Sequence, residues 1–203
     1  MTIKNRKLKI GLIIALIVIM AFCVSAVGYI AYLSPPKDKV SGFNYPPKFF
    51  CEIKENRIDY QTDGKCAAYA SAYLLRNFGE EVDGEGLYRE FKRQFGFVSA
   101  NGIVNVFKRH GYRAKAYCGN VGTLKQRLIE GQPIIVFIRI SNDTHYAVIV
   151  GYDEQNIYMV DSLEKNVNVL DERYNRAIKT KEFEAVWKNG TILPDNIYIV
   201  VKN

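Results

Sequence analysis

The chain has 203 residues, of which 48% are hydrophobic and 24% are charged, and its formal net charge is +7. This composition is typical of a folded globular protein, and no internal repeat indicates a solenoid or a propeller. The four cysteines contain no CxxC pair, which excludes zinc ribbons and thioredoxin-like redox sites. No patch interleaves basic with aromatic residues, so we expect no nucleic-acid partner. We also expect no metal and no other cofactor.

The N-terminus combines a basic segment with a long apolar one. Residues 1–9 carry four positive charges and no negative charge, and residues 10–33 are 24 consecutive uncharged residues. About 20 apolar residues span a bilayer, and positive charges before a span favour the cytoplasmic side. We therefore predict a cytoplasmic segment over 1–9, a single-pass transmembrane anchor over 10–33 and an extracytoplasmic domain. A cleaved signal peptide, whose apolar stretch is normally about 7–15 residues, is the alternative and would make the domain secreted.

Two proline pairs follow the apolar run, Pro35-Pro36 and Pro46-Pro47. Proline pairs mark turns and loops. We predict a linker over residues 34–50 and one folded domain over residues 51–203, which is long enough to bury a core of its own.

Within this domain the predicted elements change from mainly helices to mainly strands along the chain. Apolar periodicity and helix-ending glycines predict helices over 66–78, 85–95, 99–110 and 121–130. The same patterns predict strands over 56–60, 112–117, 133–140, 144–152, 157–160 and 196–201. A run of helices followed by a run of strands favours an α+β fold with an antiparallel sheet.

Cys66 opens the first, Ala-rich helix of the domain. The thiolate is the nucleophilic form of cysteine, and a helix N-terminus stabilises it. Lys65 adds a positive charge beside it. A small buried cysteine with a purely structural role is the alternative, and Cys66 alone does not decide between the two.

Three further side chains complete a candidate catalytic site. His145 begins an apolar strand, and Asp161 ends the next strand 16 residues later, so a hairpin places both at one rim of the sheet. The Asp161 carboxylate can then accept the imidazole N–H and orient the ring as a base. Gln61, five positions before Cys66, can donate to an oxyanion together with the Cys66 backbone N–H. The other histidine, His110, precedes a glycine and is expected to be a helix C-cap.

Segments along most of the domain resemble one known family. They are QTDGKCAA at 61–68, the helix that ends in Gly-Tyr at 102–112, the Gly-x-Pro and apolar strand at 131–136, HYAV at 145–148, and Asp161 followed by Phe183 and Trp187. In this order they resemble the double-glycine-type, bacteriocin-processing-like cysteine peptidases and their stand-alone homologues. The family often has a glycine after the cysteine and a proline after the aspartate, where this chain has Ala67 and Ser162.

The resemblance implies a papain-like fold with a helical N-terminal lobe and an antiparallel-sheet C-terminal lobe. It also implies that Cys66 is the nucleophile, His145 the base, Asp161 the orienting acid and Gln61 the oxyanion donor. A peptide or protein is the implied substrate, and the N-terminal helix is the contact with the membrane. The chain has no P-loop, so the nucleotide-binding part of toxin-exporting members is not represented.

Two other functions remain compatible with these residues. One is a different papain-fold chemistry, such as a peptidoglycan amidase or endopeptidase, or an acyl transferase. The other is a catalytically inactive binding module on the same fold, because a fold does not guarantee an activity. Cys51 and Cys118 can form a disulfide in an oxidising exterior, and two buried thiols are the favoured alternative. Phe183 and Trp187, at helical spacing, are expected in the core.

Overall fold

The computed structural model describes residues 3–62, 64–91, 97–141, 143–188 and 193–203, which fall into two units divided after Ser34. The first unit is helix α1 (Ile3–Leu33). Its residues Lys9–Leu33 are long and apolar enough to cross a membrane, a criterion that a signal sequence also meets. Large apolar side chains along it, from Ile10 to Val27, are exposed in the chain by itself. An apolar helix without a polar face needs an apolar surrounding such as a bilayer.

The second unit is built on one antiparallel sheet. The strands are β1 (Phe49–Phe50), β2 (Arg113–Cys118), β3 (Ile134–Ile140), β4 (Asp143–Tyr152), β5 (Asn156–Val160), β6 (Arg176–Lys179) and β7 (Ile197–Lys202). Their order is β2-β7-β3-β4-β5-β6, with β1 paired to the end of β4. The helices are α2 (Cys66–Asn77), α3 (Gly84–Tyr88), α4 (Ala100–Arg109), α5 (Val121–Leu128) and α6 (Thr180–Trp187), with a 3-10 turn η1 (Glu164–Asn166). The predicted α+β class with an antiparallel sheet is confirmed.

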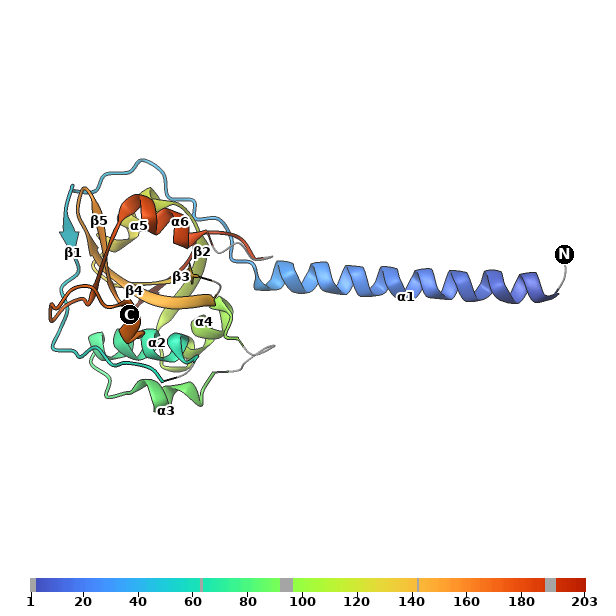
Figure 1. The fold of residues 1–203 in the computed structure, drawn as a ribbon, viewed down its shortest axis with the longest axis horizontal. Helices are drawn as coiled ribbons and strands as arrows, with labels where there is room; N and C mark the ends of the chain where they lie inside the picture. Colours follow the sequence, from blue (N-terminus) through green and yellow to red (C-terminus); the bar gives the residue numbers. More distant parts are fainter. Residues whose placement is uncertain (1–2, 63, 92–96, 142, 189–192) are drawn as a thin grey trace. The chain divides into compact units, whose positions relative to one another are not determined.

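Helices cover both faces of this sheet. Helices α2 and α4 lie on one face and α5 and α6 on the other (Figure 1). Along β3, Ile135 and Phe137 belong to the core under α2 and α4, whereas Ile134, Val136 and Ile138 belong to the opposite core. All five are buried, which explains why this strand is apolar throughout and does not alternate. Each such side chain contributes about 1.5–3 kcal/mol on burial.

The helix ends follow the capping residues. Ser99 accepts a hydrogen bond from Gly102 N–H at the start of α4, and Asp83 accepts one from Gly86 N–H at the start of α3. The helix predicted over 99–110 is therefore confirmed, with Ser99 as its N-cap. Gly79 follows α2 with φ +98°, a left-handed conformation that glycine adopts without steric cost.

Two predicted elements differ in the structure. No strand forms over residues 56–60, because Arg76 of α2 binds the Asn56 side chain at 2.9 Å and the Arg57 carbonyl at 2.8 Å. The polar groups of this segment are thus satisfied by a helix and not by a neighbouring strand. The predicted helix over 85–95 is the short α3, and part of that prediction, residues 92–96, lies outside the described residues. Strands β1 and β6 were not predicted from the sequence.

Residues 35–50, which are most of the linker predicted over 34–50, belong to the second unit and are hydrogen-bonded to it. Asp38 N–H donates to the Cys118 carbonyl at 2.8 Å, and Cys118 N–H donates to the Pro36 carbonyl at 2.9 Å. The Asp38 carboxylate is held by two hydrogen bonds from Arg127, both 2.8 Å, and by the Tyr198 hydroxyl. Because a buried carboxylate is stable only when it is paired, this contact ties the segment to α5 and β7.

Candidate active site

Helix α2 with the segment before it and strands β4 and β5 bring the four predicted site residues to one end of the sheet. Cys66 is the first residue of α2, His145 lies near the start of β4, and Asp161 directly follows β5. β4 and β5 are paired, with Val148 opposite Val160, so His145 and Asp161 reach the same rim as predicted from the hairpin. Gln61 precedes α2, and its backbone N–H donates to the carbonyl of Ser162 at 2.9 Å.

The centre of the site is a buried histidine–carboxylate pair. His145 Nε2 lies 2.8 Å from Asp161 Oδ1, and the residues are 2% and 0% exposed. Burial alone raises the pKa of Asp161, but the hydrogen bond from His145 and its positive charge lower this pKa to about 2. Asp161 is therefore ionised at neutral pH and accepts from the imidazole.

Further groups hold the Asp161 carboxylate and its backbone. Oδ1 also accepts from Leu163 N–H at 2.9 Å, and Oδ2 accepts from Asn166 Nδ2 at 3.0 Å and from Arg176 Nη1 at 2.7 Å. The Asn175 side chain accepts from Asp161 N–H and donates to its carbonyl, both at 2.8 Å. These hydrogen bonds hold the Asp161 carboxylate in one orientation.

Cys66 lies close enough to His145 to raise the pKa of its imidazole. Because Asp161 occupies Nε2, Nδ1 is the ring nitrogen that remains for the thiol. Burial alone lowers the pKa of His145, but the hydrogen bond with Asp161 and the interaction with Cys66 raise it to about 9. The imidazolium form is thus favoured at neutral pH, which is the form that pairs with a thiolate. Cys66 itself is partly exposed, as a nucleophile that meets a substrate must be.

Two features of the cysteine's surroundings follow from the fold. Lys65, at the N-cap of α2, makes no side-chain hydrogen bond to the first turn, so the unpaired N–H groups of that turn remain available. The sequence predicts that Lys65 adds positive charge beside the thiol, and the structure adds a partner for that charge. Its ammonium is paired with Glu85 of α3 at 2.8 and 2.9 Å, and Glu85 also accepts from the Tyr69 hydroxyl. Glu85 therefore offsets part of the Lys65 charge, and solvent screens this exposed pair.

Gln61 carries a buried amide with unused hydrogen-bonding capacity. Its Oε1 atom is buried and has no partner in the part of the chain that the structure describes. Leaving such a group unpaired costs about 1–3 kcal/mol, so it is rare in folded proteins. The oxygen and nitrogen of an amide exchange places by a half-turn of the side chain, so the same position can present a donor.

His110, Cys51 and Cys118 are not part of this site. His110 is the C-cap of α4, as predicted, and its ring is 2.7 Å from Glu80 and 3.2 Å from Glu90. Cys51 and Cys118 are buried free thiols in different cores, so the disulfide does not form and the alternative of two buried thiols holds. Phe183 and Trp187 are both buried completely, which confirms their predicted place in the core.

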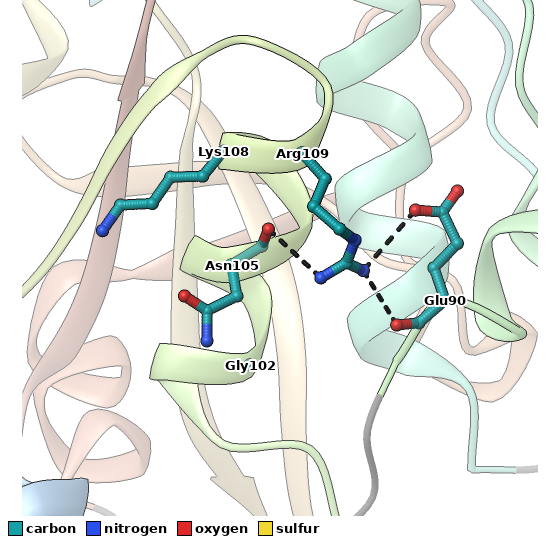
Figure 2. Close-up of a pocket in the computed structure, with 5 residues that line it drawn as sticks. All are labelled: Glu90, Gly102, Asn105, Lys108 and Arg109. Carbon is teal, nitrogen blue, oxygen red and sulfur yellow. Dashed lines mark hydrogen bonds and ion pairs between the residues drawn. The ribbon is translucent and has the colours of Figure 1, made fainter.

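A surface pocket at α4 does not include Gln61, Cys66, His145 or Asp161. Figure 2 shows that Glu90, Gly102, Asn105, Lys108 and Arg109 line it. Arg109 donates to the Asn105 carbonyl at 3.3 Å and to the Glu90 carbonyl at 2.8 Å, and it pairs with the Glu90 carboxylate at 3.5 Å. Its guanidinium is thus engaged within the domain. No group of three His, Cys, Asp or Glu residues suited to a metal ion occurs among the described residues.

Sequence reasoning missed the residues that position Asp161. Asn166 ends the short 3-10 turn η1, Asn175 lies in a loop, and Arg176 begins a strand of only four residues. The only local signal was a polar cluster about 15 positions after Asp161, which by itself is typical of a solvated loop.

Comparisons with known proteins agree on one family. The model of the peptidase C39 family matches residues 55–196. A double glycine motif protease from an AMS/PCAT transporter, solved with its leader peptide, is 17% identical with a TM-score of 0.55, covering 74% of this chain and 96% of that chain. The peptidase domain of Streptococcus ComA, a bi-functional ABC transporter involved in quorum sensing, is 16% identical with a TM-score of 0.56, covering 72% and 98%.

A C39-like peptidase from Bacillus anthracis is 17% identical with a TM-score of 0.55, and the match covers 74% of this chain and 98% of that chain. Likenesses at such low identity show a shared fold. No curated protein sequence matches the chain.

Proposed function

The chain belongs to the peptidase C39 family, and we propose that it is a cysteine peptidase that cleaves amide bonds with Cys66 as its nucleophile. The observation that carries this proposal is the buried hydrogen bond between His145 Nε2 and Asp161, with Cys66 near enough to His145 to raise the pKa of its imidazole. A nucleophile, a base and a group that orients the base are the parts that covalent acyl transfer requires.

The proposed reaction begins with transfer of the Cys66 proton to His145. The thiolate attacks the carbonyl carbon of the substrate amide, and the carbonyl oxygen becomes an oxyanion. His145 returns the proton to the leaving amine as the C–N bond breaks, which leaves a thioester on Cys66. Water, deprotonated by His145, then hydrolyses the thioester and restores the thiol. Asp161 keeps the imidazolium oriented through both steps.

We assign the oxyanion to the Cys66 backbone N–H and the Gln61 side chain. The first turn of α2 has N–H groups without intrahelical partners, and the helix dipole favours negative charge there. Gln61 supports this role because its amide is buried, has unused bonding capacity and is tied by its backbone to Ser162, next to Asp161.

We propose that α1 anchors the enzyme in a membrane with its N-terminus in the cytoplasm and the peptidase domain outside. The support is the length and apolarity of Lys9–Leu33 and the four basic residues before the apolar run. The substrate is then a peptide or protein met outside the membrane. Protease treatment of intact cells should remove a tag placed after Asn203, whereas a protected tag would reverse the orientation.

The catalytic proposal is tested by labelling and by cleavage. An epoxide inhibitor of thiol peptidases should modify Cys66 in the detergent-solubilised full chain, as read by peptide mass spectrometry. Labelling should be lost in Cys66→Ala and strongly reduced in His145→Gln. Cys23→Ala, which removes the exposed thiol of α1, is the matched control and should label normally.

A screen of peptide substrates with the same proteins completes the test. Cleavage by the wild type and by Cys23→Ala, with none by Cys66→Ala, is the expected result. A Cys66→Ala protein that cleaves as well as the wild type removes the proposal. Labelling of Cys66 that does not depend on His145 indicates an inactive binding module.

A further inference from the structure

Arg176 lies on the side of Asp161 that His145 leaves open. It begins β6, which pairs with β5 so that Arg176 stands opposite Met159, two residues before Asp161. Its Nη1 donates to Asp161 Oδ2 at 2.7 Å, and only 13% of its side chain is exposed. The carboxylate therefore has a cation on each oxygen when His145 is protonated.

We propose that Arg176 is a positioning residue of the proposed peptidase, which orients the Asp161 carboxylate toward His145 and limits how strongly that carboxylate holds the imidazolium. The inference rests on the proposed function, because it concerns the same thiol–imidazole pair. Arg176 does not contact the reacting atoms in this assignment and acts through Asp161.

The geometric part of the argument is the division of the two carboxylate oxygens. Oδ1 serves His145 and Leu163 N–H, whereas Oδ2 serves Arg176 and the Asn166 amide. If the carboxylate rotated, Oδ2 would have to leave a charged donor in a buried site, which is unfavourable. Arg176 thus keeps Oδ1 aimed at the ring.

The electrostatic part concerns the net charge around the base. The groups that act on His145 and Asp161 are each other, Cys66 at the start of α2 and Arg176 at the start of β6, with buried Tyr146 beside the thiol. With Arg176 present, thiolate, imidazolium, carboxylate and guanidinium sum to zero. Without Arg176, the site carries one uncompensated negative charge. That charge stabilises the protonated form of the imidazole and the protonated form of the thiol. The imidazolium then becomes a weaker acid toward the leaving amine.

The test measures the rate of alkylation of Cys66 by iodoacetamide against pH, with modification at Cys66 quantified by peptide mass spectrometry in the full chain. Wild type should show two transitions, one for formation of the thiolate–imidazolium pair and one for loss of the imidazolium proton. Arg176→Gln should move both transitions to higher pH, by about 1 pH unit. Arg176→Lys keeps the charge and should return both close to their wild-type positions.

Arg173→Gln is the matched control, because Arg173 lies in the preceding loop, is exposed and pairs with Asp171. It removes the same charge without removing a donor to Asp161, so its two transitions should stay in place. Circular dichroism establishes that each variant is folded. If Arg176→Gln does not fold, Arg176→Met, which keeps an unbranched apolar stem, provides the same measurement.

The outcomes separate this inference from the proposed function. A single transition at the ordinary thiol pKa in the wild type removes the proposed function itself. Two transitions in the wild type that do not move in a folded Arg176→Gln or Arg176→Met protein overturn only the role of Arg176. Equal shifts in Arg176→Gln and Arg173→Gln also overturn it, because the effect would then be one of general charge. A shift in Arg176→Gln alone, reversed in Arg176→Lys, supports it.

Discussion

The contact between Asp38 and Arg127 allows a sharp test of how residues 35–50 contribute to the domain. The Asp38 side chain is 1% exposed and accepts from Arg127 Nε and Nη2, both at 2.8 Å, and from the Tyr198 hydroxyl. Arg127 belongs to α5, 89 residues further along the chain. Asp38→Ala removes the only carboxylate that makes this bidentate pair.

The expected cost follows from the guanidinium that is left behind. Removing one partner of a buried ion pair costs about 3–5 kcal/mol, because the other charge stays uncompensated. Arg127 is 19% exposed and keeps a 2.8 Å contact with Glu130, so we expect the lower end of that range. For a domain of this size about 1 kcal/mol changes the melting temperature by roughly 2–4 °C. Asp38→Ala should therefore melt roughly 6–12 °C below the wild type.

The pKa of Asp38 sets the pH at which this contribution is present. Burial raises the pKa of Asp38, but the hydrogen bonds from Arg127 and Tyr198 lower it by more than burial raises it. The pKa of Asp38 is therefore below its usual value of 3.8. A lowered carboxyl pKa stabilises the fold above the unfolded value, and the contribution is lost as the pH falls. The difference between wild type and Asp38→Ala should hold at neutral pH and decrease below about pH 4.

The assay is thermal unfolding of the full chain in detergent, followed by circular dichroism. Asp171→Ala is the control, because Asp171 forms a comparable pair with Arg173 whose arginine is 55% exposed. Exposed pairs contribute about 0–1 kcal/mol, so this variant should melt close to the wild type. If Asp38→Ala melts no lower than Asp171→Ala, residues 35–50 are a separate tether and the reasoning fails.

The remaining predictions concern the site and the core. Gln61→Ala should lower kcat roughly 10²-fold with little change in KM, and an unchanged kcat would rule out Gln61 as an oxyanion donor. Because the pKa of His145 is raised to about 9, its pairing with Asp161 stabilises the fold fully below pH 6.5 and weakens as the pH rises through 9. Between about pH 6 and about pH 10, the free energy of unfolding measured in urea should fall by about 3 kcal/mol more for the wild type than for His145→Gln. Equal decreases in the two proteins would contradict this coupling. Trp187→Phe removes the indole N–H that donates to the buried Ile197 carbonyl at 2.9 Å, and it should lower the free energy of unfolding by about 2 kcal/mol in the same assay. An unchanged free energy of unfolding would mean that water replaces the lost donor.

Much of the site was predictable because its residues are placed by local rules. Cys66 begins a helix because alanines follow it and Gly79 ends it, and both signals lie within one segment. His145 and Asp161 share a rim because they belong to consecutive strands of one hairpin, which forms between neighbours in the chain. The order of Gln61, Cys66, His145 and Asp161 therefore carried the resemblance to the family before any geometry was known.

Other features depend on contacts between distant residues. The Asn56 side chain and the Arg57 carbonyl bond to Arg76, which has no counterpart in the local pattern of residues 56–60. Lys65 has a carboxylate partner because α3 brings Glu85 to it from 20 residues away. In both cases the charged partner comes from another element, so the segment alone does not show it.

The sequence by itself determined the apolar helix, the α+β class, the helix that begins at Cys66 and the hairpin of His145 and Asp161. These depend on hydrophobic periodicity and capping, which act over a few residues. Only the tertiary structure decided that Arg176 shares the Asp161 carboxylate and that Asp38 ties residues 35–50 to α5 and β7. Both are buried ion pairs whose strength depends on the removal of water by packing, and packing is a property of the whole fold.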